Sequence, residues 1–394
     1  MASYKYPGVY IEEVASGVRP IESASTSTAV FIGTTTKGSA DDPPKLISKW
    51  SEYQGDNQFG DIMGAGGAPN AMGLAAYTFF LNGGGAAYIC HVGTDADAEA
   101  YKKVFASLEK IRDINIICLP GKTYDDDKDI FDQAIAHAEN VMKNRMVIVD
   151  VGENTELDKN TSSTSLDLPS SPFSVAYYPW LEVNNPNYKK DAETGVETGG
   201  EKTFKVAPSS FAAGMWAKID GRRGVWKAPA GVETSLLGVA GLADNVDDAQ
   251  QGVLNPLGVN CIRRVPGAGP VIWGARTLAT QKSHDWRYVP VRRTAIMIEE
   301  SIYNNIQWAV FEPNDHRLWS SLRVNIDAFM NGLWRAGAFQ GEKASDAYFV
   351  RCNLDDTMTQ TDIDLGRVIV DVGFAPVKPA EFVIIRIQQK VAQQ

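Results

Sequence analysis

The pattern of side chains over the C-terminal residues repeats every two positions, which predicts a β-strand. This strand would have to pair with another strand. Residues 381–391 follow Lys378-Pro379 and read EFVIIRIQQKV without a break. Successive side chains of a strand point to opposite faces. The apolar members of the segment are Val383, Ile385, Ile387 and Val391 on one face and Phe382 and Ile384 on the other. A segment this apolar needs a sheet to pair with, either in its own chain or in a neighbouring one.

The N-terminal residues predict a second short strand, which follows Tyr6-Pro7-Gly8. Its apolar residues are Val9, Tyr10, Ile11 and Val14. We therefore expect extended, strand-forming arms over residues 1–22 and 379–394. These arms either complete sheets of their own chain or pair with neighbouring subunits. The second possibility favours an assembly subunit over a catalyst.

The residues between the arms predict a layer of alternating helices and strands. Apolar runs bounded by turn residues predict strands at 23–33, 45–48, 87–92, 114–119, 146–151 and 173–178. Helical spacing predicts helices at 69–81, 96–111, 128–141 and 209–219. Continuous Val/Ile runs after amphipathic helices are typical of buried parallel strands, so we expect an α/β domain over 95–272. Residues 23–94 are expected to pack with it. Residues 153–170 and 184–203 are polar and predict a loop and an insertion.

The last third of the chain predicts an α+β domain over residues 273–378. Two long helices are expected at 291–311 and 315–336, because isoleucine and leucine recur every four residues. Two strands are expected at 347–352 and 367–372.

Composition and charge narrow the possible functions. The net charge is −10, and residues from Cys261 onward hold 16 basic and 14 acidic side chains, which leaves 22 basic and 34 acidic in the first 260. No basic stripe points to nucleic acid. No apolar run is long enough to cross a membrane, and the N-terminus lacks a signal-peptide pattern, so we expect the chain to be made and folded in a cytoplasm. The four cysteines are far apart in apolar stretches, which predicts buried free thiols.

Several motifs in one order resemble the contractile phage tail sheath proteins. They are Tyr6-Pro-Gly-Val-Tyr-Ile-Glu-Glu13, Tyr177-Tyr-Pro-Trp180, Val206-Ala-Pro-Ser-Ser210 followed by Gly214, Arg223-Gly-Val-Trp-Lys-Ala-Pro-Ala230, Asn260-Cys-Ile-Arg-Arg264, Trp273-Gly-Ala-Arg-Thr277, 289–293 and Phe311-Glu-Pro-Asn314. The resemblance covers nearly the whole chain.

This resemblance implies a structural role without enzyme activity, cofactor or metal. Sheath subunits form a helical homo-oligomer around an inner tail tube and contract to drive the tube through a target envelope. In relatives the terminal arms add strands to the C-terminal domains of neighbours, and the middle domain is described as subtilisin-like. The resemblance also implies baseplate and tail terminator proteins as partners. The mature location would be a virion tail or a released phage-tail-like particle.

A serine hydrolase of subtilisin-like fold is the alternative, with Ser209 or Ser210 at a helix start as the nucleophile. Such an enzyme needs a histidine base oriented by a carboxylate. The chain has four histidines, His91, His137, His284 and His316, and none lies in a Gly-flanked catalytic context. We therefore interpret Ser209 or Ser210 as a helix N-cap. Similarly, Asp125, Asp126, Asp127 and Asp129 predict helix capping rather than a cation site.

Basic residues in the second half of the chain are candidates for contacts between subunits. Arg263, Arg264, Arg292 and Arg293 are candidates for salt bridges within the lattice, and Arg323, Arg335 and Lys343 for contact with an acidic tube. The alternative is that these side chains are solvated or paired within the chain.

Overall fold

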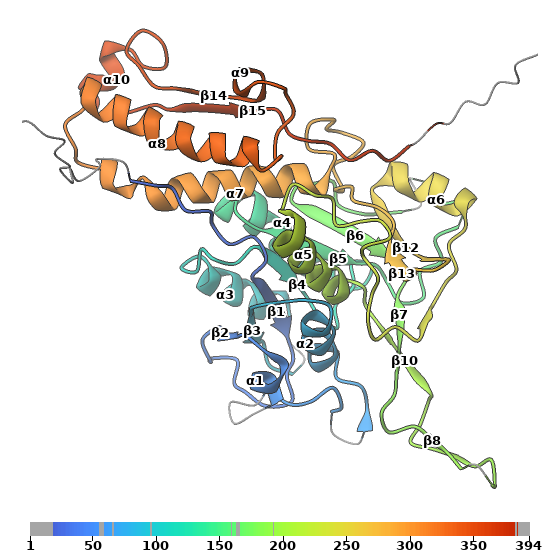
Figure 1. The fold of residues 1–394 in the computed structure, drawn as a ribbon. Coiled ribbons are helices and arrows are strands. Elements are labelled where there is room, and N and C mark those ends of the chain that lie inside the picture. The colour runs from blue at the N-terminus through green and yellow to red at the C-terminus, as the bar shows by residue number, and fades with distance from the viewer. Residues whose placement is uncertain are drawn as a thin grey trace, which may run out of the picture. The chain divides into compact units, whose positions relative to one another are not determined.

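The computed structural model describes residues 19–54, 59–64, 67–94, 97–158, 160–162, 166–191, 193–382 and 384 (Figure 1). The chain forms two compact units. The large unit consists of Ala24–Glu300 with Pro376–Gln394, and the small unit consists of Met1–Ser23 with Ser301–Ala375. No helix in the described part of the chain is long and apolar enough to cross a bilayer.

An eight-stranded sheet forms the centre of the large unit, in the order β13-β12-β6-β5-β4-β1-β3-β2. Its strands are β1 (Ala29–Gly33), β2 (Lys45–Ile47), β3 (Ala87–His91), β4 (Ile116–Cys118), β5 (Met146–Asp150), β6 (Ser174–Tyr178), β12 (Val259–Val265) and β13 (Gly269–Ile272). The six inner strands pair in parallel, and β2 and β13 pair antiparallel at the two edges. The predicted α/β layer is confirmed. Residues 23–94 supply three strands of this same sheet.

Helices pack around the sheet and bury apolar side chains in the core. They are α1 (Trp50–Gln54), α2 (Ala71–Leu81), α3 (Ala98–Leu108), α4 (Lys128–Ala136), which continues as a π-helix over His137–Met142, α5 (Ser209–Arg223), α6 (Asp248–Leu254) with a 3₁₀ turn at Asn255–Leu257, and the first part of α7 (Val289–Asn305). Helices α2 and α5 pack against each other on the face that presents Phe31 and Tyr177. The right-handed crossover rule places α3 and α4, which also pack together, on the opposite face.

The region expected to be a polar insertion is partly ordered into short strands. A three-stranded antiparallel sheet joins β7 (Leu181–Asn184), β10 (Thr203–Val206) and β11 (Gly241–Leu242), and a hairpin joins β8 (Lys189–Lys190) and β9 (Glu197–Thr198). All four cysteines are buried free thiols, as predicted.

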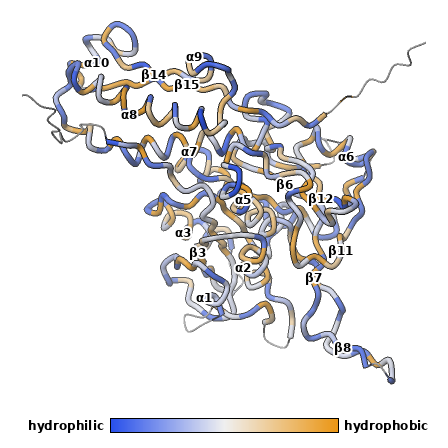
Figure 2. The backbone as a smooth tube through the Cα atoms, in the orientation of Figure 1, coloured by the Kyte–Doolittle hydropathy of each residue, from blue (hydrophilic) through white to orange (hydrophobic). Residues whose placement is uncertain are grey.

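The small unit is an α+β structure built on one long helix. Its elements are a 3₁₀ turn at Gln307–Ala309, α8 (His316–Arg335), α9 (Ala344–Ala347), β14 (Tyr348–Arg351), α10 (Gln360–Asp364) and β15 (Asp371–Phe374). Hydrophobic and hydrophilic positions alternate along α8 (Figure 2), and its buried residues Leu318, Trp319 and Leu322 pack with Cys352 and Met358. The antiparallel β14–β15 pair lies beside α8 (Figure 1).

Several element boundaries predicted from the sequence are wrong, and packing explains two of them. Helix α7 ends at Asn305 rather than at residue 311, because Ile306 and Trp308 pack against the small unit's cluster instead of continuing the helical stripe. Beyond the turn, Val310 is 58% exposed, and Phe311 is fully exposed with a left-handed φ of 70°. The last predicted strand begins at Asp371, because Val368 and Val370 also pack on that cluster.

The two compact units divide the chain after Glu300, within α7. The predicted domain division, with a C-terminal domain over 273–378, stays a prediction.

Candidate functional site

The hydroxyl groups of Ser209 and Ser210 are buried and already hydrogen-bonded. Ser209 Oγ donates to Asp150 Oδ2 at 2.5 Å, and the Ser209 N–H donates to Asp150 Oδ1 at 3.1 Å. Ser210 Oγ lies 2.8 Å from Thr78 Oγ1. The N-cap prediction is wrong, because Pro208 occupies the cap position and Asp150 at the end of β5 receives the first N–H of α5.

No histidine contacts either serine in the part of the chain that the structure describes. His91 Nδ1 is 3.0 Å from the Thr35 N–H, and His137 Nε2 is 3.2 Å from Arg145 Nη1. Burial and the adjacent Arg145 lower the pKa of His137 to about 4, so this ring is neutral at physiological pH. A buried serine without a histidine base and without access to solvent cannot attack an acyl group. The surroundings of Ser209 and Ser210 therefore do not support the hydrolase alternative.

The predicted aspartate caps of α4 are not made by aspartate side chains. Asp127 is the N-cap residue, but its carboxylate pairs with Lys122 at 2.8 Å instead of bonding to a helix N–H. Asp125 accepts bonds from the Gly152 N–H and the Thr155 hydroxyl, each at 2.6 Å. The cluster therefore joins the ends of neighbouring strands. No metal-binding group of acidic, histidine or cysteine side chains is found among the described residues.

Arg292 and Arg293 are buried inside the large unit, which contradicts their assignment as lattice contacts. Arg293 is 4% exposed and pairs with Asp220 at 2.5 Å. Arg292 is 7% exposed, pairs with Glu299 at 3.2 Å and stacks against the ring of Phe173. A side chain held in this way does not reach a neighbouring subunit, so both arginines stabilise the position of α7 in this unit.

The other five basic candidates lie nearer the surface. Arg263 pairs with Asp248 at 2.8 Å, and exposed Arg264 donates to the Ala240 carbonyl at 3.1 Å. In the small unit, Arg323 bonds to the Cys352 carbonyl and to Ser320. Arg335 and Lys343 are exposed, and neither makes an ion pair with another described residue. Of the seven candidates, Arg335 and Lys343 are therefore the two whose charged groups are most accessible to another protein.

A buried ion pair holds the start of the C-terminal arm against the large unit. The guanidinium of Arg276 meets the carboxylate of Glu381 in two parallel bonds, Nε to Oε1 at 2.9 Å and Nη2 to Oε2 at 2.5 Å. The Tyr288 hydroxyl adds a third bond at 3.1 Å. The side chains of Arg276 and Glu381 are 9% and 16% exposed. We call these three residues the arm clasp.

The arm residues beyond the clasp are only partly described. Phe382 and Ile384 are 75% and 79% exposed and lie outside any strand. The remaining arm residues lie outside the described part of the chain; they are Val9, Tyr10, Ile11, Val14, Val383, Ile385, Ile387 and Val391. The strand prediction for both arms therefore stays a prediction.

The small unit presents a sheet that is open to further strands. Its β14–β15 sheet has two strands, so each has an outer edge with no strand partner in the described structure. The Phe349 ring lies over Gly373 across the pair, where an added Cβ would come within 2.3 Å of it. Open edges of this kind are templates for strands from other chains.

Family models match both parts of the chain. The model described as the phage tail sheath protein central domain matches residues 94–278, and the model described as the phage tail sheath C-terminal domain matches residues 281–390.

Solved structures match over almost the full length. A chain of the anti-feeding prophage baseplate is 31% identical, with a TM-score of 0.78, over 99% of this chain and 100% of that one. The sheath of the extracellular contractile injection system PVC in its contracted state is 30% identical, with a TM-score of 0.78, over 99% of both chains.

Curated relatives match over shorter segments. The tail sheath protein of Burkholderia phage BcepMu is 35% identical over 143 residues, which are 34% of this chain and 30% of that protein. The tail sheath protein of Vibrio phage KVP40 is 27% identical over 175 residues, 44% of this chain and 25% of that protein. The chain thus matches less than a third of either phage protein's length.

Proposed function

Because this chain belongs to the family of contractile tail sheath proteins, we propose that it polymerises helically around an inner tube and contracts to drive that tube through a target cell envelope. The observation that carries this proposal is the match to a contracted sheath subunit over 99% of both chains at 30% identity. That match includes the large unit, the small unit and the C-terminal segment. The chain is a structural sheath subunit, and its relatives are structural proteins rather than enzymes.

We further propose that the terminal arms link neighbouring subunits by strand addition to the β14–β15 sheet. Each backbone hydrogen bond contributes about 0.5–1.5 kcal/mol net. About six such bonds, together with burial of the arm's apolar side chains, would make a durable link. The open edges of β14–β15 and the exposure of Phe382 and Ile384 support this arrangement.

Strand pairing between neighbouring subunits would keep them connected while the lattice contracts. The surfaces between subunit bodies would change partners during contraction while the added strands stay paired. The extended lattice would be metastable and would switch cooperatively once contraction starts at one end. In this scheme the exposed cations Arg335 and Lys343 of the small unit suit contact with an acidic tube surface.

The remaining parts of the proposal follow from the family. Tube, baseplate and tail terminator proteins would be the partners, nucleic acid would not be bound, and assembly would take place in the bacterial cytoplasm before incorporation into a tail or a released particle. The parallel sheet of the large unit is compatible with a subtilisin-like domain, and that finer description stays part of the proposal.

The test is electron microscopy of the purified chain, alone and with its tube protein, beside a variant that lacks residues 382–394. We expect hollow striated sleeves from the full chain and short or absent sleeves from the variant. The deletion begins after Glu381 and so keeps the arm clasp, and circular dichroism should show an unchanged fold. Long, stable sleeves from the variant would exclude the arm role, and uniform small particles from the full chain would exclude assembly itself.

A further inference from the structure

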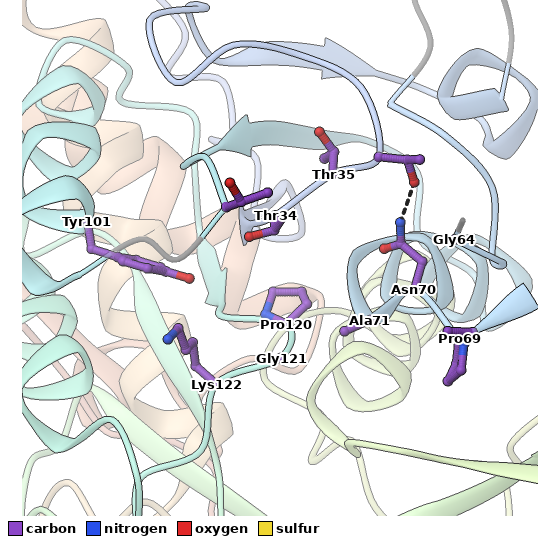
Figure 3. Close-up of a pocket in the computed structure, with 13 residues that line it drawn as sticks. Thr34, Thr35, Gly64, Pro69, Asn70, Ala71, Tyr101, Pro120, Gly121 and Lys122 are labelled. Carbon is purple, nitrogen blue, oxygen red and sulfur yellow. Dashed lines mark hydrogen bonds between the residues drawn. The ribbon is translucent and has the colours of Figure 1, made fainter. Parts of the chain in front are cut away.

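A cavity of about 570 Å³ opens where the carboxyl ends of β1, β3 and β4 meet in the large unit (Figure 3). The strand order reverses at this point, because the chain runs from β1 to β3 on one side and continues through β4 on the other. Open parallel sheets bind ligands at this kind of topological switch point. The cavity plays no part in the assembly function proposed above.

Tyr101 places an unsatisfied hydroxyl in this cavity. The residue is 1% exposed, and no described residue makes a hydrogen bond to its hydroxyl. Figure 3 shows the Tyr101 hydroxyl directed into the cavity from α3. Burial and the charge of Asp127 both raise the pKa of Tyr101, so the hydroxyl stays protonated and remains a donor. The hydroxyl is thus a hydrogen-bond donor that no described group of the chain uses, and a ligand in the cavity would accept its bond.

Other hydrogen-bond donors converge on the same space. Ala71 is the first residue of α2, and its N–H has no acceptor within the helix, since the Asn70 cap serves the Gly73 N–H. The Thr36 hydroxyl oxygen accepts from Asn70 Nδ2 at 2.6 Å, which leaves its own proton free to donate. The positive end of the α2 dipole adds to the attraction for an anion.

Lys122 supplies the only cationic side chain among the described residues that line the cavity, and none of these residues is acidic. Its Nζ lies 5.9 Å from the centre of the Tyr101 ring. Asp127, outside the lining, pairs with this Nζ at 2.8 Å and compensates part of the charge. An ammonium group has three donors, so two remain for a ligand.

We propose that this cavity binds the phosphate group of a small organic molecule. Every group identified above donates a hydrogen bond, and a phosphate offers several anionic oxygens to accept them. The cavity falls within the range of about 300–1,000 Å³ typical of small-molecule sites and is much larger than inorganic phosphate needs. An organic part attached to the phosphate would occupy the remaining space.

The test is calorimetric titration of the unassembled full-length chain with adenosine monophosphate, inorganic phosphate and acetate at constant ionic strength. We expect binding of the two phosphates, tighter for the nucleotide, and no binding of acetate. Tyr101→Phe removes only the unsatisfied hydroxyl, so it should fold normally and weaken phosphate binding by about tenfold or more, as expected for a bond to a charged group.

Tyr53→Phe is the matched control, because Tyr53 is fully buried, its hydroxyl also lacks a partner, and it lies outside the cavity lining. This variant should bind phosphate like the parent. No binding of either phosphate, equal binding of acetate, or equal affinities for Tyr101→Phe and the parent would each overturn the proposal. The experiment needs no sheath assembly, so its outcome is independent of the assembly function.

Discussion

At the scale of single residues, Arg293 shows how a full charge is accommodated inside the large unit. Asp220 accepts two bonds from its guanidinium, at 3.0 and 2.5 Å, and the Thr26 carbonyl accepts another at 2.8 Å. The Thr26 hydroxyl donates to the same carboxylate, and the Trp216 ring covers the guanidinium at 4.5 Å. Because both carboxylate oxygens of Asp220 and both terminal nitrogens of the Arg293 guanidinium have partners, the two charges are tolerated only together.

We therefore predict that Asp220→Ala destabilises the chain by about 3–5 kcal/mol, since it leaves Arg293 buried without compensation. The free energy of unfolding in urea measures this loss. Glu197→Ala is the matched control, because Glu197 pairs with Lys190 at 2.9 Å in a largely exposed position. That change should cost less than about 1 kcal/mol. An equal loss of unfolding free energy in the two variants would show that the buried Asp220–Arg293 pair contributes no more than the exposed pair.

Asp150 makes stability depend on pH in an unusual direction. Burial raises the pKa of Asp150 to about 7, although both bonds from Ser209 favour the charged form. The folded chain then holds a proton that the unfolded chain releases near pH 4. Asp150 therefore contributes stability that is fully present below about pH 4 and is lost as pH rises toward 7.

A shift of about three units corresponds to about 4 kcal/mol, so Asp150→Asn should remove a decline of this order between pH 4 and pH 7. The asparagine resembles the protonated carboxyl, and the variant should match the parent at low pH and exceed its stability at pH 8. Urea unfolding of both chains at several pH values tests this. Parallel pH profiles for the two proteins would mean that Asp150 is already ionised in the folded chain.

These residue-scale features could not be read from the sequence, because no local pattern links their members. Asp150 and Ser209 are 59 residues apart, and Arg276 and Glu381 are 105 apart. Ser209 at a helix start looked like a cap, since the side chain is of the capping type. Only the fold shows that the capping group comes from another strand. The buried pairing of Arg293 with Asp220, 73 residues away, was hidden for the same reason.

At the scale of elements, one glycine sets how closely α2 and α5 pack. A Cβ on Gly214 of α5 would lie 2.5 Å from the Phe79 carbonyl oxygen of α2, so the two backbones approach as only glycine allows. We predict that Gly214→Ala forces the helices apart and costs about 1–3 kcal/mol, the usual penalty of overpacking. Thermal unfolding measures the effect.

Gly221 in the same helix provides the opposite case. Nothing lies within 4 Å of its added Cβ, and the residue is exposed. Gly221→Ala should therefore stabilise the chain by about 0.5–1 kcal/mol through the ordinary helix preference for alanine. If Gly214→Ala raised the Tm, as Gly221→Ala should, helix propensity would outweigh helix packing at Gly214.

Elements with a strong internal pattern were predictable from the sequence, and those decided by packing were not. Helix α8 begins after Asp315, which accepts bonds from the Arg317 and Leu318 N–H groups, and its leucine stripe was evident beforehand. Strands β4 and β5 are short Val/Ile runs buried on both faces. By contrast, the end of α7 depends on where Ile306 finds its apolar neighbours, which local spacing does not encode.

At the scale of the whole molecule, the proposed sheath requires a C-terminal segment that reaches a neighbouring subunit and stays attached to its own. The chain returns to the large unit at Pro376, and the arm clasp fixes it at Glu381 immediately before the exposed Phe382. A charged pair buried at this position and bonded in parallel resists displacement better than a surface pair. In the proposed sheath, a pull on a strand-paired arm would therefore reach the body of the subunit through Arg276.

We predict that Glu381→Gln leaves folding intact but weakens the sheath. The glutamine keeps the shape of the side chain and loses its charge, so the arm should detach from Arg276 under load, and sleeves imaged after contraction should be shorter and more often broken than those of the parent. Asp248→Asn is the matched control, since it removes a partner of Arg263 in a far more exposed pair of the same unit. Sleeves from this control should keep the parental length. If Glu381→Gln sleeves were as long as those of the control, the arm would hold the lattice through its strand alone, and the clasp would serve only to order the free subunit.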